Sequence, residues 1–260
     1  VANSRVLRET GFEDIYIQPS AGDGGAALGA ALYVWHCALG NKRQFVMDHA
    51  YWGQSYGVDE IRSAIGDSGM KGQLIEDSAK LAEITVENLT SGKVVGLFQG
   101  RFEWGPRALG NRSILADPRR AEMKDIVNNK IKFREPFRPF APAVLAEAAE
   151  RYFDLPDPDR HMPARFMLLV VPVHEDKQDV VPAVNHLGTA RLQTVYRDTS
   201  PFYHRLIEGF GEATGVPVLL NTSFNVRGEP IVNTPEDALN TFANSGIDSL
   251  ILGNFVIDKP

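Results

Sequence analysis

The stretch Gly100–Arg119 reads GRFEWGPRALGNRSILADPR and follows directly on the apolar run Val94–Phe98. It carries four arginines and three glycines, whereas the run before it is typical of a short buried strand. Glycine lets backbone N–H groups approach a ligand closely, and a guanidinium group matches two phosphate or carboxylate oxygens at once. A strand that leads into such a loop indicates an anion site. The alternative is a solvated loop whose arginines pair with nearby acids such as Glu103 and Asp117.

The rest of the chain alternates between helical and strand patterns, which predicts an α/β fold. We expect helices over 24–39, 74–89, 122–131, 201–214 and 235–245, and strands over 14–17, 93–98, 166–173, 216–220, 249–252 and 255–257. A boundary between two units is expected between Gly57 and Gln73, after an irregular connection.

The composition and net charge of the chain argue against several classes of function. The chain has 260 residues, a net charge of −6 and a pI near 5.6, which argues against general nucleic-acid binding. Cys37 is the single cysteine, so no intrachain disulfide can form and a cytoplasmic setting is the default expectation. The apolar stretch Ala26–Leu39 is too short and too rich in small residues to span a membrane, and we expect no membrane partner.

Three further segments carry a family resemblance together with Gly100–Arg119. They are Ile17–Leu32 (IQPSAGDGGAALGAAL), Lys132–Pro142 (KFREPFRPFAP) and Leu220–Ile231 (LNTSFNVRGEPI). In this order they resemble the O-carbamoyltransferases of nodulation-factor and antibiotic biosynthesis. The resemblance implies that residues 1–72 are the incomplete C-terminal part of an actin/sugar-kinase-like ATPase domain. Residues 73–260 would form the twisted open-sheet domain that makes carbamoyl-adenylate, and the chain would be the C-terminal portion of a longer protein.

The resemblance also implies a reaction. The enzyme would use carbamoyl phosphate and ATP to form carbamoyl-adenylate, and would pass the carbamoyl group to a hydroxyl of a sugar-containing acceptor, a nodulation factor or an antibiotic. A homodimer is compatible with this expectation. One alternative is a carbamoyl- or threonylcarbamoyl-adenylate enzyme of tRNA modification or hydrogenase maturation. Another is a nucleotide-binding module without catalysis.

A carbamate and the phosphates of ATP repel each other, so such a reaction needs clustered cations. Lys132 and Arg138 lie in a basic segment stiffened by prolines, and Arg134 shares a face with Lys132 if the segment is extended. Ordinary surface charge is the other interpretation. The resemblance implies catalytic roles for Lys132, Arg138 and Arg191, although His186-Leu187-Gly188 replaces the His-Val-Asp-Gly that the family usually carries before the last of these.

The nucleotide phosphates would be held by Arg107, Ser223 and Asn225, because a Ser-x-Asn segment at this position contacts phosphate in adenylate-forming relatives. A turn stabilised by its own Ser and Asn side chains is the alternative.

Asp23, Gly24 and Gly25 begin a predicted helix, whose N-terminus suits phosphate. The resemblance implies that Gly24 and Gly25 bind the nucleotide. It also implies that Asp23 ligates a divalent metal such as Mg or Fe, with histidine partners from preceding sequence. A simple helix cap is the alternative for Asp23.

Overall fold

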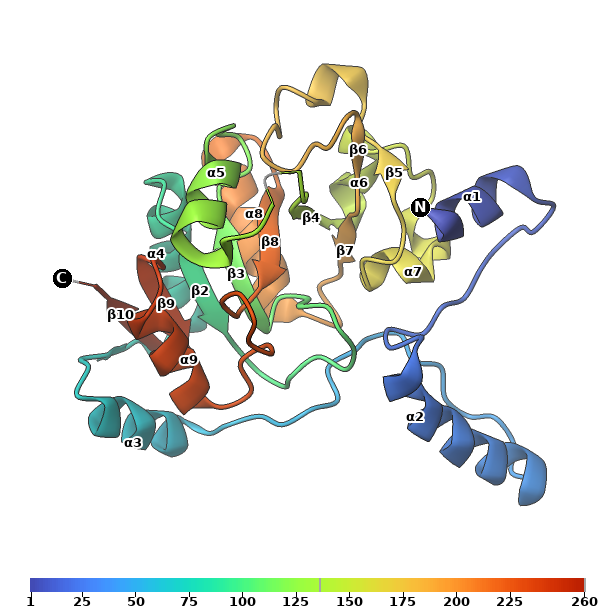
Figure 1. The fold of residues 1–260 in the computed structure, drawn as a ribbon, viewed down its shortest axis with the longest axis horizontal. Helices are drawn as coiled ribbons and strands as arrows, with labels where there is room; N and C mark the ends of the chain where they lie inside the picture. The colour runs from blue at the N-terminus through green and yellow to red at the C-terminus, as the bar shows by residue number, and fades with distance from the viewer. Residues whose placement is uncertain (136, 260) are drawn as a thin grey trace.

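A computed structural model describes residues 1–135 and 137–259, which are built around one large mixed sheet (Figure 1). The strand order is β1 (Gln73–Leu74), β10 (Phe255–Asp258), β9 (Ser249–Leu252), β2 (Val95–Phe98), β3 (Arg112–Ala116), β8 (Val218–Ser223), β4 (Ala141–Leu145) and β7 (Gln193–Val195). The pairs β2–β9 and β4–β7 are parallel, and the remaining pairs whose register is known are antiparallel. A separate hairpin pairs β5 (Val171–Pro172) with β6 (Thr189–Ala190). The α/β expectation is confirmed.

Helices cover both faces of the sheet. In Figure 1, α4 (Ser78–Thr90) and α8 (Pro201–Thr214) lie behind it, packed along each other. In front lie α5 (Met123–Val127), which continues into the π-helix η2 (Asn128–Lys132), and α9 (Pro235–Ala243), which packs on α3 (Val58–Ser68). Smaller helical turns follow β4: η3 (Ala146–Ala148), α6 (Ala149–Tyr152), η4 (Pro158–Arg160), α7 (Met162–Arg165) and η5 (Glu175–Lys177).

The N-terminal segment lies beside this body. It comprises α1 (Ala2–Glu9) and α2 (Asp23–Tyr33), and α2 runs on into a π-turn, η1 (Val34–Ala38). In Figure 1, α2 projects away from the sheet, and an extended connection leads on to α3. Helix α1 is fastened to the body because Asn3 donates to the Leu168 carbonyl at 2.9 Å and Ser4 Oγ accepts from the Val170 N–H at 2.8 Å. Among the described residues, no helix is long and apolar enough to cross a membrane.

Several sequence predictions need correction. Residues 14–17 run as irregular backbone rather than as a strand, and in 166–173 only Val171–Pro172 is strand. The part of the arginine-rich stretch from Arg112 to Ala116 is the fully buried strand β3, not loop. The prediction for 201–214 is confirmed residue for residue, because Pro201 and Gly215 mark the two ends of an amphipathic helix.

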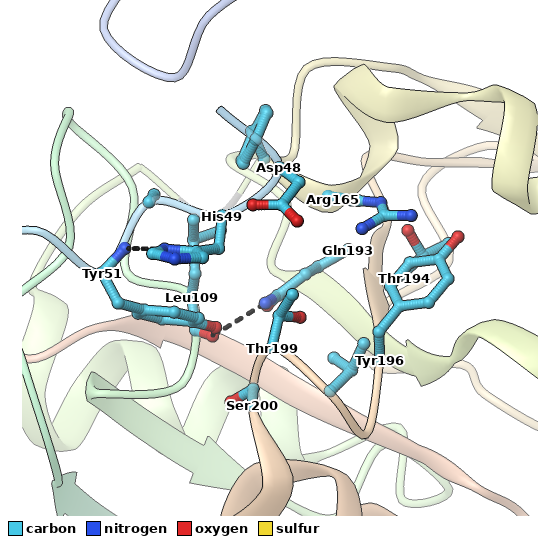
Figure 2. Close-up of a pocket in the computed structure, with 13 residues that line it drawn as sticks. Asp48, His49, Tyr51, Leu109, Arg165, Gln193, Thr194, Tyr196, Thr199 and Ser200 are labelled. Atoms are coloured by element: carbon cyan, nitrogen blue, oxygen red, sulfur yellow. Dashed lines mark hydrogen bonds between the residues drawn. The ribbon is translucent and has the colours of Figure 1, made fainter. Parts of the chain in front are cut away.

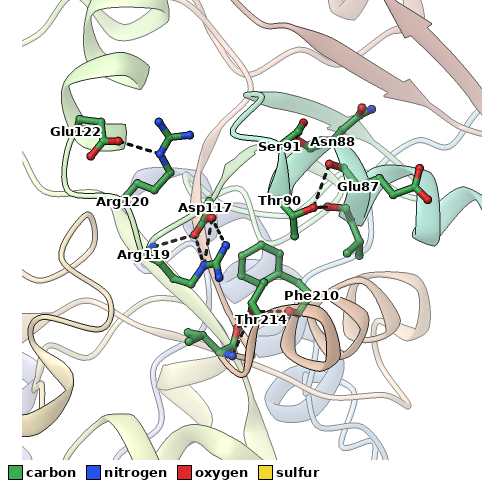
Figure 3. Close-up of polar contacts among 12 residues, drawn as sticks. Glu87, Asn88, Thr90, Ser91, Asp117, Arg119, Arg120, Glu122, Phe210 and Thr214 are labelled. Carbon is green, nitrogen blue, oxygen red and sulfur yellow. Dashed lines mark hydrogen bonds and ion pairs between the residues drawn. The ribbon is translucent and has the colours of Figure 1, made fainter.

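The end of β3 shows how one arginine of the stretch is used structurally (Figure 3). Asp117 is fully buried and receives the Arg119 guanidinium, with Nη2 to Oδ2 at 2.7 Å and Nε to Oδ1 at 3.0 Å. The same guanidinium lies over the Phe210 ring of α8, 5.4 Å from its centre. Arg119 therefore ties the strand to the helix layer behind it.

Candidate functional site

One buried carboxylate, that of Glu103, holds the loop between β2 and β3 in place. Glu103 is 4% exposed, and its Oε1 accepts from the backbone N–H groups of Leu109, Asn111 and Arg112 at 2.7, 2.8 and 3.2 Å. Burial raises the pKa of this carboxyl, and the backbone donors counteract part of that rise. By accepting these three hydrogen bonds, the Glu103 carboxylate fixes the backbone conformation of residues 103–112.

Arg112, at the end of this loop, is also structural. Its guanidinium lies 3.5 Å from the centre of the Phe98 ring and 5.5 Å from that of Phe102. Its Nη1 donates to the Gln99 carbonyl at 2.7 Å. Burial lowers its pKa to about 10, while Glu103 and Tyr56 raise it. The aromatic rings and backbone oxygens replace the water that a buried arginine would otherwise need.

The four arginines of the stretch therefore have different uses. Arg101 donates to the carbonyls of Gly53 and Trp52, and Arg112 and Arg119 are held as described above. Within residues 1–135 and 137–259, Arg107 is the one of the four whose side chain makes no hydrogen bond or ion pair, and its buried Nε has no acceptor. Among the described residues, the alternative that the arginines pair with nearby acids thus holds for Arg119 with Asp117, whereas Glu103 accepts from backbone N–H groups and Arg107 has no partner.

Arg107 belongs to a cluster with Arg134 and Arg191. The pKa of Arg191 is lowered to about 10 by burial first, and then by the charges of Arg107 and Arg134. Burial also lowers the pKa of Arg107 and of Arg134. Each of the three has a buried Nε atom without a hydrogen-bond acceptor. In the described part of the chain, these three half-buried guanidinium groups thus lie near one another, each with an unpaired Nε donor, and positively charged groups with unpaired donors are what an anion site needs.

Lys132 lies beside this cluster at the end of η2. It is 5% exposed, and its Nζ donates to the Ser223 carbonyl at 2.6 Å and to the Asn225 carbonyl and Oδ1 at 2.8 Å each. Ser223 Oγ donates in turn to Asn225 Oδ1 at 2.7 Å. Burial, and then the charge of Arg134, lowers the pKa of Lys132 to about 7. The structure therefore brings three of the expected residues, Lys132, Ser223 and Asn225, into one group.

The geometry of the Lys132 segment differs from the extended form that would place Lys132 and Arg134 on one face. Lys132 ends a π-helix, and Phe133 adopts a left-handed conformation with φ of 45°. Arg138 is exposed and pairs with Glu135 at 3.0 Å, and its charge lowers the pKa of Arg134. Arg138 is thus at the rim of the cluster. Pro136, part of the expected proline-stiffened segment, lies outside the described residues.

Asp23, Gly24 and Gly25 form the first turn of α2, as expected. Gly25 has a packing reason, since a Cβ there would come within 2.1 Å of the Ser20 carbonyl oxygen. Gly105 of the arginine loop backs onto the same turn, because its Cβ would come within 2.7 Å of the Pro19 oxygen. Asp23 is exposed, and among the described residues no three His, Cys, Asp or Glu side chains could together hold a metal ion. The residues present do not by themselves fit a metal.

A small polar pocket lies behind the arginine loop (Figure 2). Its lining includes Asp48, His49, Tyr51, Arg165 and Tyr196, together with Leu109, Gln193, Thr194 and Ser200. The Arg165 guanidinium lies 3.8 Å from the centre of the Tyr196 ring. The Leu109 carbonyl accepts from both the Tyr51 hydroxyl at 2.9 Å and Gln193 Nε2 at 2.7 Å. Leu109, from the loop that carries Arg107, therefore forms part of the pocket wall.

Sequence reasoning missed several residues of this region. Arg134 was noticed only as a neighbour of Lys132, and Glu103 only as a possible partner for arginine. Gln193 carries no local signal, because a single amide in an apolar strand is not distinctive, and Asn221 lies in the segment Leu220–Ile231 but has no assigned role there. The strand position of Asn221, two residues before Ser223, is the one cue that could have pointed to it.

Comparison with known proteins gives two family matches. The family described as "Carbamoyltransferase C-terminus" matches residues 86–259, and that described as "Carbamoyltransferase N-terminus" matches residues 1–32.

Similar curated proteins include nodulation protein NolO of Bradyrhizobium diazoefficiens, which is 46% identical over 99% of this chain and 47% of that protein. The 3'-hydroxymethylcephem-O-carbamoyltransferase of Streptomyces clavuligerus is 32% identical over 97% of this chain and 45% of that protein. The uncharacterized protein sll1178 of Synechocystis is 44% identical over the whole chain and 46% of that protein. The chain thus spans less than half the length of these relatives.

Among solved structures, full-length HypF in its phosphate- and nucleotide-bound form aligns with a TM-score of 0.43 and 16% identity. The alignment covers 72% of this chain and 25% of HypF.

Proposed function

Because this chain belongs to the carbamoyltransferase family, we propose that it is the part of an O-carbamoyltransferase that forms carbamoyl-adenylate from carbamoyl phosphate and ATP. The family matches confirm the resemblance found in the sequence. The observation that carries the proposal is the cluster of Arg107, Arg134 and Arg191, whose buried Nε atoms have no acceptor in the part of the chain that the structure describes.

The domain organisation is part of the proposal. Residues 1–72 would be the C-terminal part of an actin/sugar-kinase-like domain, and residues 73–260 the adenylate-forming domain. The two family matches, over 1–32 and 86–259, lie on either side of this boundary and support it.

The chemistry requires anions to approach each other. Carbamoyl phosphate gives carbamate and inorganic phosphate by hydrolysis. A carbamate oxygen then attacks the α-phosphorus of ATP, and the bond from that phosphorus to the oxygen bridging to the β-phosphate breaks, which releases pyrophosphate. The attacking and leaving groups are both negatively charged, so cations fixed in advance lower the barrier. Arg107, Arg134 and Arg191 would supply them.

The remaining residues have distinct roles in this proposal. The hydroxyl of Ser223 would donate to a phosphate oxygen after leaving Asn225 Oδ1, and the amide of Asn225 would do so after leaving the Glu229 carbonyl. Lys132 would hold both residues in place, since its Nζ already contacts the main chain of each. Arg138, paired with Glu135 at the rim, would act on the ligand only after leaving that pair.

In the second half-reaction, the acceptor hydroxyl oxygen would attack the carbamoyl carbon, AMP would leave and the hydroxyl proton would pass to a base. We propose a hydroxyl of a nodulation factor or of an antibiotic as the acceptor, since one relative is named a nodulation protein and another a hydroxymethylcephem O-carbamoyltransferase.

Calorimetry with Mg-ATP tests the proposal. Arg107→Ala and Arg191→Ala should each weaken binding roughly tenfold to a hundredfold, the effect of losing a hydrogen bond to a charged group. Arg101→Ala is the matched control, because it removes an arginine of the same loop that contacts only backbone carbonyls. Carbamoyl-phosphate-dependent exchange of pyrophosphate into ATP should follow the same order. Unchanged ATP affinity in both cluster variants would contradict the proposal.

A further inference from the structure

We propose that Gln193 and Asn221 are positioning residues, which set the geometry of the arginine cluster through a buried amide bridge. The inference rests on the proposed function, because ATP is taken as the ligand of that cluster. Among the described residues, neither amide hydrogen-bonds an arginine of the cluster, and both would act through the chain segments that carry its residues.

The bridge spans two strands of the sheet. Asn221 lies on β8 opposite Ala141 of β4, and Gln193 lies on β7 opposite Ala143 of β4. Strands are about 4.8 Å apart, so side chains two strands apart meet only if the strand between them carries small residues. Both β4 residues are alanines, and Asn221 Nδ2 donates to Gln193 Oε1 at 2.9 Å.

Both amides also hold the arginine loop. Gln193 Nε2 donates to the Leu109 carbonyl at 2.7 Å, and Asn221 Nδ2 donates to the Ala108 carbonyl at 3.2 Å. Figure 2 shows the Gln193 amide directed at Leu109. The two carbonyls belong to the two residues that directly follow Arg107, so the bridge sets where Arg107 leaves the loop.

The same bridge also connects to the two other segments of the candidate site, which carry Arg191 and Ser223. Arg191 lies two residues before Gln193, and Ser223 lies two residues after Asn221 on the same strand, so that Ser223 shares its sheet face. One pair of hydrogen-bonded amides therefore connects the segments that carry Arg107, Arg191 and Ser223.

Apolar side chains would stabilise the protein core better than these two buried amides do. Gln193 is 2% exposed and Asn221 is 1% exposed, and the buried Asn221 Oδ1 has no hydrogen-bond donor among residues 1–135 and 137–259. A buried polar atom without a partner is unfavourable, and apolar side chains of similar volume would avoid it. What the amides supply and apolar groups do not is a fixed direction for three backbone segments.

A double-mutant cycle tests the inference. ATP affinity is measured by calorimetry for the wild type, Gln193→Met, Arg107→Ala and the double variant. Methionine keeps the length of the side chain and removes both amide hydrogen bonds. We expect Gln193→Met to weaken binding about tenfold, because misplacing a charged contact by about 1 Å is costly. Arg107→Ala should then have a much smaller effect in the Gln193→Met background than in the wild type, since a displaced Arg107 has less to lose.

Two further variants separate positioning from folding. Asn221→Ala breaks the same bridge from the other strand and should reproduce the coupling to Arg107. Thr85→Val is the control: Thr85 is fully buried, and its hydroxyl donates to the Leu81 carbonyl within α4, away from the site. It should leave ATP affinity unchanged even if it lowers stability.

The outcomes distinguish the two claims. If Arg107→Ala weakens ATP binding while both bridge variants bind normally, or if their effects simply add to that of Arg107→Ala, the positioning role is overturned and the proposed function stands. If the wild type does not bind ATP, or if Arg107→Ala binds it normally, the proposed function fails and the inference fails with it.

Discussion

Arg191 is half-buried close to two other positively charged side chains, those of Arg107 and Arg134. This placement predicts that Arg191 lowers the stability of the ligand-free protein and strengthens its binding of ATP. The pKa of Arg191 is lowered from the ordinary value of an arginine to about 10, first by burial and then by the charges of Arg107 and Arg134. At about 1.4 kcal/mol per pKa unit, this difference corresponds to about 3 kcal/mol. At pH 7 the group is charged in both the folded and the unfolded state, so the folded protein carries the full cost, which disappears only as the pH rises through about 10 towards the pKa of the unfolded chain. Arg191→Met should therefore raise the free energy of unfolding of the ligand-free protein by about 1–3 kcal/mol.

Urea unfolding at pH 7, with and without ATP, measures both sides of this trade-off. ATP should stabilise the wild type, because its phosphates bind the folded cluster and not the unfolded chain. Arg191→Met should be more stable without ATP and gain little from it. Arg101→Met, which removes an arginine bound to backbone carbonyls, should gain no stability and should still respond to ATP. A loss of more than about 1 kcal/mol in Arg191→Met would refute the reasoning, since it would mean that the cluster stabilises the free fold.

Two other predictions follow from single residues. Because the pKa of Lys132 is lowered to about 7 and a bound anion raises it, ATP affinity should fall by up to about tenfold per pH unit above pH 7. Calorimetry at several pH values checks this. The ATP affinity of Lys132→Met should depend less on pH than that of the wild type, and this variant also controls for titration of the nucleotide. Equal pH dependence in the two proteins would contradict the prediction. Gly110 has φ of 114°, and a Cβ there would lie 2.3 Å from the Tyr203 ring, so Gly110→Ala should cost more than about 2 kcal/mol in urea unfolding. Gly66→Ala, in helix α3 with open space around its Cβ, should instead stabilise by roughly 0.5–1 kcal/mol, and similar effects at the two sites would argue against the packing described.

The sequence predicted those elements whose local signals agree with their packing. The helix over 201–214 and the helix capped by Thr234 both have an amphipathic pattern and clear end residues. Strand β3 was missed because Arg112 looks like a solvated residue, and only the tertiary contact with Phe98 makes its burial possible. The apolar run over 166–173 was read as a strand, but most of it packs as irregular chain beneath α1.

Some residues of the candidate site could likewise be predicted from the sequence, and others could not. Arg107, Lys132, Ser223 and Asn225 could be chosen from the sequence because each lies in a segment that resembles the family. That Lys132 contacts the Ser223 and Asn225 main chain, 91 and 93 residues away, could not be foreseen from spacing. The same holds for the amide bridge between Gln193 and Asn221, which exists only because β4 carries alanines between them.

The strand order determines when the protein can fold during its synthesis. Val95 of β2 pairs with Ser249 of β9, and Gln73 of β1 pairs with Val256 of β10. The middle of the sheet therefore stays incomplete until the ribosome has released β9, and its first edge strand waits for β10. Contacts between residues so distant in sequence form slowly, because a long loop must close before any hydrogen bond is gained. The edge of β2 that pairs with β9 thus stays open while residues 99–248 are synthesised, and an open apolar strand edge is the kind of surface that chaperones shield in nascent polypeptides.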